Sequence, residues 1–445
     1  MEEAEREDRR IKKRIDEPLV FPDITEKGRI KKTILNFKTI LYHYQLALRY
    51  DAIKREIIYS FTDSDLETSI GNNNDYEQFI TYCTDICCKE GLPATRTDVM
   101  NWVYYIANEG RFNAVKRCLH EFYARYKGEP GEFDKFMDCI KFANNEEFSK
   151  MLFKKSLWQS IAMIHNENGE YGADGALTMQ GDQGIGKTSL LRKMCECFDG
   201  AKYFKEGGAF DKAILKDDVL QNTANFICEL GEATTSISMV DWIKRFITNP
   251  IDELRPPYGT KAKKFPRLTS FYLTVNDVEF LRDVENRRFW TVKVADINLN
   301  ALSKIDYPKL WSEIYQLFLD NPAGFRLTVL ERQMLNQINR EFRILSKEER
   351  VIMDCYDWGE PREDWKEKTA TEIATEVLEV TGQSIAPQKI GVALSNIGYS
   401  TESSEFPKRT LDGKSLYTTP KPHSKVETGC PMDASQKGKV LKLVK

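Results

Sequence analysis

The chain has no strong excess of charge, few histidines and no long apolar run. Its 65 basic residues are balanced by 68 acidic ones, which leaves a net charge of -3. Nothing therefore attracts nucleic acid to the chain as a whole, and any site for a polyanion must be local. No apolar run approaches the ~18 residues that span a bilayer, and no secretory leader opens the chain. We expect a soluble, cytoplasmic protein without a membrane partner.

Cysteine spacing excludes two further classes of protein. The 10 cysteines show no paired small-loop pattern, which argues against a secreted disulfide framework. Cys83, Cys87 and Cys88 stand together in "CTDICC", but no second cysteine or histidine pair follows at the spacing of a zinc finger. We expect buried or incidental thiols in a reducing compartment.

At 445 residues the chain is long enough for about three domains of ~150 residues each. The pattern of residues 1–143 predicts a charged N-terminal arm followed by an all-helical assembly domain. Apolar residues recur there at spacings of three and four in "ILNFKTILYHYQLALRY" and "VMNWVYYIANEGRF", the pattern of amphipathic helices. Thr95, followed by Asp98, indicates the start of one of these helices.

Residues 144–345 predict an α/β domain. Short apolar segments, "ALTM", "ANFICEL", "SFYLTVN" and "RRFWTVKV", alternate with helical patterns, which is typical of a largely parallel sheet covered on both faces. Functional residues of such sheets lie at the carboxyl ends of the strands.

Residues 346–422 predict a third domain of helix, helix and hairpin. A winged helix and generic helical packing both fit that order, and the first would bind DNA. Residues 423–445 are polar and Lys-rich, and we expect them to be disordered.

The segment "GDQGIGKTSL" satisfies G-x-x-x-x-G-K-[ST] between a strand and a helix, the context that a phosphate-binding loop requires. Glycines let backbone N–H groups face the phosphates of ATP, the lysine neutralises β and γ oxygens, and the threonine hydroxyl binds Mg²⁺. A plain turn between a strand and a helix is the alternative. The predicted ATP-binding residues are Gly181, Gly184, Gly186, Lys187, Thr188 and Ser189.

Two acidic residues follow the next apolar strand. Glu229 and Glu232 in "ICELGE" could divide two roles, one holding Mg²⁺ with Thr188 and the other polarising the attacking water. The sequence does not decide which residue has which role, and either one could instead begin a helix or pair with a lysine.

Further catalytic candidates follow two later strand patterns. Asn276 ends "SFYLTVN" and could orient water or the γ-phosphate, although asparagine at a strand end is also ordinary turn chemistry. Arg287 and Arg288 precede "FWTVKV". Either one could stabilise a transferring phosphoryl group from a neighbouring subunit, or both could form a surface cation pair.

Residues 255–267, "RPPYGTKAKKFPR", combine basic and aromatic side chains without an acidic residue. Bases could stack on the aromatic rings while cations follow the phosphates, although a solvated basic loop is also possible. The predicted DNA-binding residues are Arg255, Tyr258, Lys261, Lys263, Lys264 and Arg267.

The order of "GDQGIGKTSLLRK", "ICELGE", "RPPYGTKAKKFPR", "TVND" and "FLRDVENRRFW" resembles the virulence-associated protein E family. These AAA+ ATPases are similar to superfamily-three helicases of phages and mobile elements. The resemblance is strong over residues 145–345 and weaker back to about residue 20.

The resemblance implies a hexameric ring that hydrolyses ATP between subunits and moves single-stranded or forked DNA past a pre-sensor hairpin. The separation of Glu229 from Glu232 departs from the adjacent acids of many AAA+ proteins. No strand-borne acidic pair in the N-terminal part suits a primase, so a primase or host replication protein would be a separate chain.

Our functional prediction is a replicative DNA helicase of a mobile element. The alternatives are a non-unwinding helicase loader or origin-assembly factor, and, less well supported, a small-molecule kinase.

Overall fold

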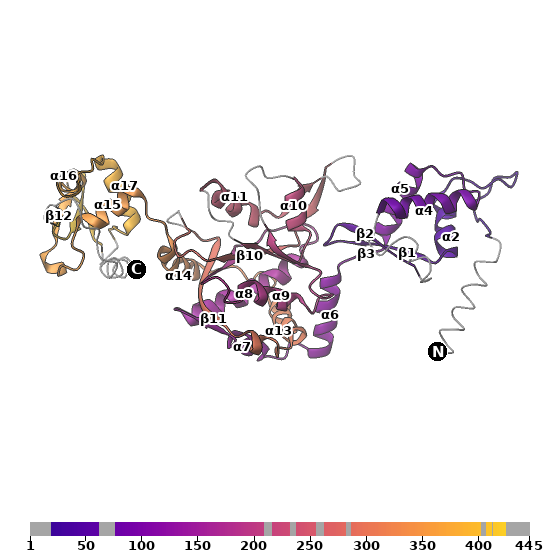
Figure 1. Ribbon diagram of the computed structural model, residues 1–445, viewed down its shortest axis with the longest axis horizontal. Coiled ribbons are helices and arrows are strands. Elements are labelled where there is room, and N and C mark those ends of the chain that lie inside the picture. Colours follow the sequence, from indigo (N-terminus) through magenta and orange to yellow (C-terminus); the bar gives the residue numbers. More distant parts are fainter. Residues whose placement is uncertain are drawn as a thin grey trace.

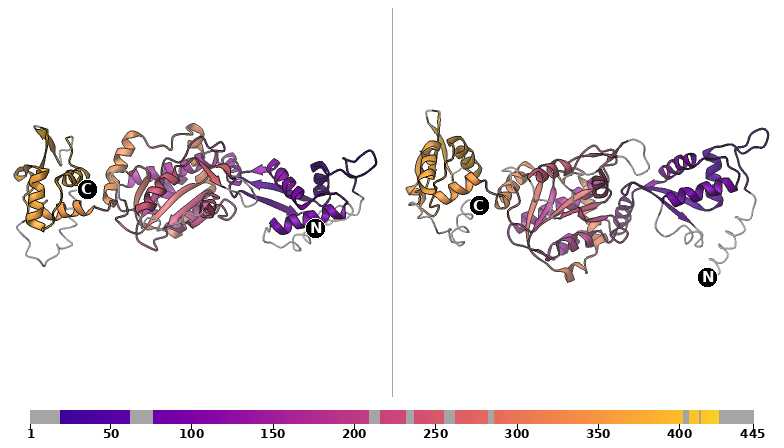
Figure 2. Two further views of the ribbon diagram at one scale, coloured as in Figure 1. Left: turned by 90° about the horizontal axis from the view of Figure 1, so that it is seen from above. Right: turned by 45° about the horizontal axis from the view of Figure 1, so that its top comes forward.

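The computed structural model describes residues 19–61, 76–208, 216–231, 237–254, 262–281, 286–401, 406–411 and 413–423. These residues form three units with separate cores, arranged in a row along the long axis of the molecule (Figure 1). Both further views show the same row (Figure 2). The charged arm and nearly all of the Lys-rich tail lie outside the described residues. Among the described helices, none is both long enough and apolar enough to cross a bilayer.

The N-terminal unit packs helices on a small sheet of order β2-β1-β3. At the start of α5, Thr95 and Asp98 form a reciprocal capping box, which confirms the expected helix start. Cys83 and Cys87 are buried on the inner face of α4. The elements are α2 (Ile34–His43), β1 (Leu46–Asp51), β2 (Glu56–Phe61), α4 (Tyr76–Lys89), α5 (Arg96–Glu109) and β3 (Arg111–Phe112).

The expectation of an all-helical N-terminal domain was wrong. The helical spacing of "ILNFKTILYHYQLALRY" stops at Gln45, whose φ of 54° is left-handed, and the chain continues as β1, paired antiparallel with β2. Arg55, with φ of 59°, completes the turn between the two strands. Because neither residue is glycine, the usual sequence signal for a left-handed turn is missing.

The central unit contains a six-stranded sheet of order β4-β11-β5-β10-β7-β6. Strand β4 pairs antiparallel with β11, and the remaining pairings are parallel. The prediction of a largely parallel sheet is therefore confirmed. Strands β5 and β10 are buried along their whole length, as expected where helices cover both faces.

Helices α8 and α9, which lie between strands of the sheet in sequence, and α14, which follows its last strand, pack against the sheet. The strands are β4 (Ile140–Phe142), β5 (Ala176–Gln180), β6 (Phe204–Gly208), β7 (Ile227–Gly231), β8 (Ile251–Leu254), β9 (Lys263–Pro266), β10 (Ser270–Val275) and β11 (Phe289–Ile297). The α-helices are α6 (Ala114–Tyr126), α7 (Glu132–Met137), α8 (Glu146–Ile164), α9 (Lys187–Cys195), α10 (Lys216–Thr223), α11 (Ile237–Ile247), α12 (Leu299–Leu302), α13 (Tyr307–Asp320) and α14 (Val329–Asn339), and a 3-10 turn, Arg340–Phe342, follows.

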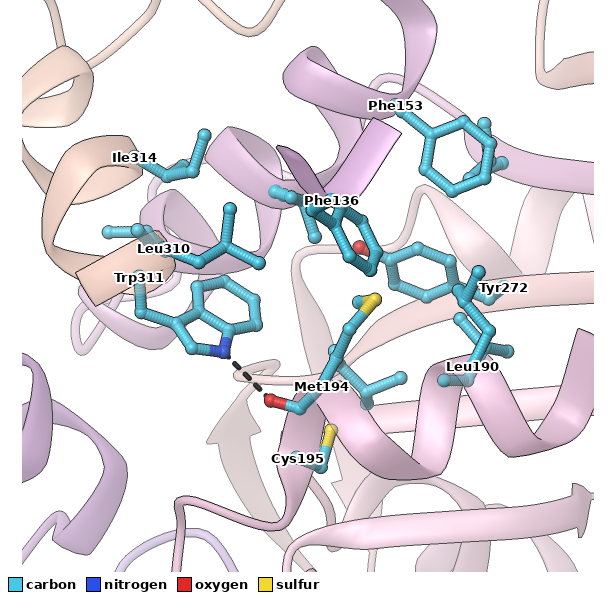
Figure 3. Close-up of a cluster of buried hydrophobic side chains, with 14 of the residues drawn as sticks. Phe136, Phe153, Leu190, Met194, Cys195, Tyr272, Leu310, Trp311 and Ile314 are labelled. Atoms are coloured by element: carbon cyan, nitrogen blue, oxygen red, sulfur yellow. Dashed lines mark hydrogen bonds between the residues drawn. The ribbon is translucent and has the colours of Figure 1, made fainter. Parts of the chain in front are cut away.

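The core of the central unit joins helix α13 to the helix that follows the Gly-rich loop. The Trp311 indole of α13 donates to the Met194 carbonyl of α9 at 2.8 Å, among buried side chains of α7, α8 and β10 (Figure 3). Helices α6 and α7 also pack on α13, so these two helices, placed before residue 143 by the sequence pattern, contribute to this core.

The C-terminal unit packs three helices against an antiparallel sheet of order β12-β14-β13. Capping boxes at Ser346–Glu349 and Thr369–Glu372 begin α15 and α16. The expected helix, helix and hairpin are present as α16, α17 and β13–β14. The elements are α15 (Lys347–Cys355), β12 (Lys366–Thr369), α16 (Ala370–Thr381), α17 (Pro387–Ile397), β13 (Lys408–Leu411) and β14 (Lys414–Thr419), with a 3-10 turn at Arg362–Asp364.

Candidate active site

Three parallel strands of the central sheet end at one edge. In the register of β10, Val275 lies opposite Gln180 of β5 and Thr274 lies opposite Gly231 of β7. The residues that follow these strands therefore meet at the same edge of the sheet, the usual position of a ligand site in an open α/β sheet.

The loop after β5 needs glycine for conformational and steric reasons. Gly184 and Gly186 have φ of 85° and 98°, a region that side chains disfavour. A Cβ atom on Gly181 would lie 2.4 Å from the Val294 carbonyl oxygen, so the backbone approaches too closely for any other residue. Gly186 ends the loop without a side-chain cap. The first turn of α9, where Ser189 is half-buried, thus keeps N–H groups that suit an anion.

Lys187 is buried, and its Nζ atom is surrounded by oxygen atoms. Nζ donates to the carbonyl oxygens of Gly181 at 2.6 Å and Asp182 at 2.8 Å, and to Oδ1 of Asn276 at 3.0 Å. Burial lowers the pKa of Lys187, while Asp182 and Glu229 raise it by a smaller amount. The ammonium group therefore lies in a dehydrated position where a phosphate oxygen would interact strongly with it.

Glu229 joins the loop helix to the sheet. The carboxylate is buried at 2% exposure, and its Oε1 atom accepts from Oγ1 of Thr188 at 2.6 Å and from Oγ1 of Thr274 at 2.8 Å. The structure thus brings together Lys187, Thr188, Glu229 and Asn276. Glu232 lies outside the described residues.

Thr274 was missed by the sequence reasoning. The signal was its position two residues before Asn276, because alternate residues of a strand lie on one face. Gln180 was missed too, although it ends the strand that leads into the Gly-rich loop. Its Nε2 atom donates to the carbonyl oxygen of Asn276 at 3.2 Å.

A glycine loop, a buried lysine, a threonine and a strand-borne carboxylate at one sheet edge are the parts expected of the predicted family. Residues 124–344 match the family model of the virulence-associated protein E-like domain. The chain carries a virulence-associated protein E-like domain. This match spans the central unit from the last turn of α6 to just beyond the 3-10 turn.

Other comparisons give distant similarities. One apo structure of the NrS-1 C-terminal region is 13% identical, with a TM-score of 0.42 over 86% of this chain and 98% of that one. Another, of residues 305–718, is 13% identical, with a TM-score of 0.39 over 65% of this chain and 75% of that one. No curated protein matches the chain.

The two arginines of the virulence-associated protein E-like domain lie away from its Gly-rich loop. Both precede β11, whose Phe289 lies opposite Ala176 at the amino end of β5, whereas the loop follows the carboxyl end. Arg287 is exposed. Arg288 is half-buried and donates to the Lys244 carbonyl. Strand β5 alone separates its ends by about 16 Å at ~3.3 Å per residue, so neither arginine is brought to Lys187 of its own chain.

The basic segment of the domain is built on a hairpin in which β8 pairs antiparallel with β9. Lys263 and Lys264 are exposed on β9. Arg267 is fully buried and bound to Asp252, so its guanidinium group holds the base of the hairpin and is not available to DNA. Arg255, Tyr258 and Lys261 lie outside the described residues.

Proposed function

We propose that the chain is an ATP-hydrolysing AAA+ motor that moves DNA during replication of a mobile element. The observation that carries this proposal is the convergence of Lys187, Thr188, Glu229 and Asn276 at one sheet edge, with direct hydrogen bonds between them. A phosphate-binding loop alone would also fit a small-molecule kinase. The exposed lysines of a hairpin in the same domain favour a polyanionic substrate.

The side chains at this edge fit ATP with Mg²⁺. A magnesium ion is usually held by one or two protein oxygens together with phosphates and water, and the Thr188 hydroxyl and Glu229 carboxylate supply such a pair. Bound Mg²⁺ would neutralise charge on the β- and γ-phosphates. Lys187 would add a second positive charge beside them, and Asn276 would orient the attacking water from the strand between β5 and β7.

The position of the arginines supports assembly. Arg287 and Arg288 lie toward the opposite end of the paired strands from Lys187, so a second copy of the chain would be needed to present them to the nucleotide. We therefore propose a ring, a hexamer by analogy with the family, in which Arg287 stabilises the transferring phosphoryl group of the neighbouring subunit. Arg288 is the weaker candidate, since the Lys244 carbonyl already binds it.

The C-terminal unit is proposed to be a winged helix that binds DNA. Its chain order, α15, β12, α16, α17 and the β13–β14 hairpin, places a helix-turn-helix before a hairpin. Gln388, Lys389 and Val392 are exposed on α17, and Arg409 and Lys414 are exposed on the hairpin. In this arrangement α17 would enter the major groove and the hairpin would contact the backbone.

The test is ATP hydrolysis by the full chain with and without single-stranded DNA, followed by strand displacement on a forked duplex. We expect severalfold stimulation by DNA and unwinding that requires ATP. Hydrolysis with no displacement would support the helicase loader or assembly factor instead. Absence of hydrolysis with Mg²⁺ present would reject the motor.

A further inference from the structure

The N-terminal unit inserts one turn into the central unit. This turn joins β1 to β2 and carries Arg55, which is 5% exposed. Arg55 Nη2 donates to Asp252 Oδ2 of β8 at 3.0 Å, and Nη1 donates to Thr223 Oγ1 of α10 at 3.0 Å. The guanidinium group also lies 5.0 Å from the ring centroid of Phe265 on β9. The turn therefore contacts both strands of the basic hairpin.

Further contacts fix this junction. Arg267 binds the same Asp252 carboxylate, so one buried acid joins two buried arginines. Lys54 Nζ donates to Asn225 Oδ1 at 2.7 Å, and the Tyr203 hydroxyl donates to Asp51 Oδ2 at 2.8 Å. Ionic contacts with so little solvent exposure hold their geometry well, because each charged group that lost its partner would remain buried and unpaired.

Two aromatic rings, with a cation at each end, form a row across the junction. Lys263 Nζ lies 4.3 Å from the Tyr104 ring centroid and donates to the Tyr104 hydroxyl at 2.9 Å. The centroids of the Tyr104 and Tyr50 rings are 6.3 Å apart. The guanidinium group of Arg111 lies over the Tyr50 ring, 5.5 Å from its centroid. Arg111 is exposed, and among the described residues no carboxylate forms an ion pair with it. The row thus extends the positive charge of β9 onto the N-terminal unit.

A cavity of about 370 Å³ adjoins this row. Arg55, Arg111, Phe112 and Phe265 contribute to its wall. The one acidic residue in the lining is Glu167, which is paired with Lys116 at 3.0 Å. The volume lies within the ~300–1,000 Å³ range of small-ligand sites, and a wall of guanidinium groups and aromatic rings suits a nucleotide unit.

We propose that Tyr104, Arg111 and the adjoining cavity form a single-stranded DNA-binding site that continues from the basic hairpin onto the N-terminal unit. This inference rests on the proposed function and extends it to residues outside the virulence-associated protein E-like domain. Unstacked bases expose the faces that aromatic rings bind, whereas a duplex hides them, so single strands are the favoured ligand. Arg111 binds a phosphate, and Tyr104 and Phe112 provide apolar contact to bases.

The test is fluorescence anisotropy of labelled oligothymidine with the full chain over a range of salt concentrations. Tyr104→Ala should weaken binding about tenfold through loss of stacking. Arg111→Ala should weaken it several-fold and reduce the slope of log affinity against log salt by about 0.7, as expected for one lost phosphate contact on a single strand. Arg111→Lys should restore most of that slope.

Each position has a matched control. Tyr105→Ala removes an adjacent exposed ring that is near Lys38, and Arg117→Ala removes an exposed arginine that is paired with Glu121. Both should bind oligothymidine like the wild type, and thermal denaturation checks that every variant is folded.

Two failures can be told apart. If the wild type binds oligothymidine and folded Tyr104→Ala and Arg111→Ala bind it equally well, this site is rejected while the motor stands. If the wild type neither binds oligothymidine nor hydrolyses ATP, the proposed function falls with it.

Discussion

At the scale of single residues, Lys187 shows how the fold prepares a charge for a ligand. Three oxygen atoms surround its ammonium group, and burial lowers its pKa. These oxygens compensate for lost water, and an incoming phosphate would bring a stronger negative charge to the same place. In the proposed ATPase, the lysine would thus be fixed before a nucleotide binds, and little reorganisation would be needed at the reacting centre.

Lys187→Ala should lower ATP turnover by about two orders of magnitude or more, because a charge aimed at the β- and γ-phosphates is lost. Steady-state phosphate release with saturating ATP and Mg²⁺ is the measurement. Lys193→Ala, in the last turn of the same helix, is the matched control and should turn over like the wild type. Undiminished turnover by Lys187→Ala would show that this loop does not bind the reacting phosphates.

His165 makes a second residue-scale prediction, which concerns stability. Burial lowers its pKa to about 4 from the ordinary 6.5, and its ring packs against Tyr315 and Phe318. The unfolded chain binds the proton more tightly than the folded chain does. The contribution of His165 to the free energy of unfolding is therefore complete above pH 6.5 and is lost as the pH falls toward 4. Urea denaturation should show about 2 kcal/mol lost through His165 between pH 7 and pH 5. His165→Gln should show a smaller loss over that range, and an unchanged pH dependence would contradict the assignment.

At the scale of elements, the base of the β8–β9 hairpin depends on one acidic residue. The sequence predicted a basic projection here, and the structure adds that Asp252 binds Arg55 and Arg267 together. "IDEL" gives no indication of which acid faces inward until the strand is paired. Register decides this, because side chains alternate between faces and a shift of one residue would bury Glu253 instead.

Asp252→Ala should destabilise the protein by about 3–5 kcal/mol, because it leaves two buried guanidinium groups without their partner. Chemical denaturation at neutral pH measures this loss. Glu253→Ala, at the exposed neighbouring position, should change stability by less than about 0.5 kcal/mol. Equal effects of the two substitutions would mean that the pairing contributes nothing specific.

Elements differed in how far the sequence could predict them. Strands β5, β7, β10 and β11 were recognisable because continuous apolar runs of that length are typical of buried parallel strands. The β1–β2 hairpin was not, because Gln45 before β1 and Arg55 in the turn between the strands take left-handed conformations where glycine would have been the signal. Tyrosine, leucine and isoleucine in that region also fit the apolar spacing of an amphipathic helix. Packing against α5 decided between that helical spacing and the alternation of a strand.

At the scale of the whole molecule, the two halves of the proposed catalytic site are separated within one chain. The phosphate-binding loop and Arg287 lie toward opposite ends of the paired strands β5 and β11. Under the proposed function, a single copy would carry two incomplete sites, and a ring of copies would complete each one across an interface.

Mixing two inactive variants tests this arrangement. Lys187→Ala and Arg287→Ala should each be inactive alone, yet recover up to roughly a quarter of wild-type hydrolysis when mixed, because random assembly combines an intact loop with an intact arginine at one interface in about four. Phosphate release after subunit exchange is the readout. No recovery between variants that do exchange would place the catalytic arginine elsewhere, and Arg288→Ala in the same mixture tests its neighbour.

The sequence alone determined the Gly-rich loop, the parallel sheet and the candidate residues at its strand ends, because each depends on spacing along a short stretch of chain. Tertiary structure decided that Thr188 and Thr274 both donate to Glu229. It also decided that Arg267 is buried and that Arg55 binds Asp252, which is 197 positions away in the sequence. These contacts depend on which strands become neighbours and in which register, and that choice is made by the packing of the whole chain.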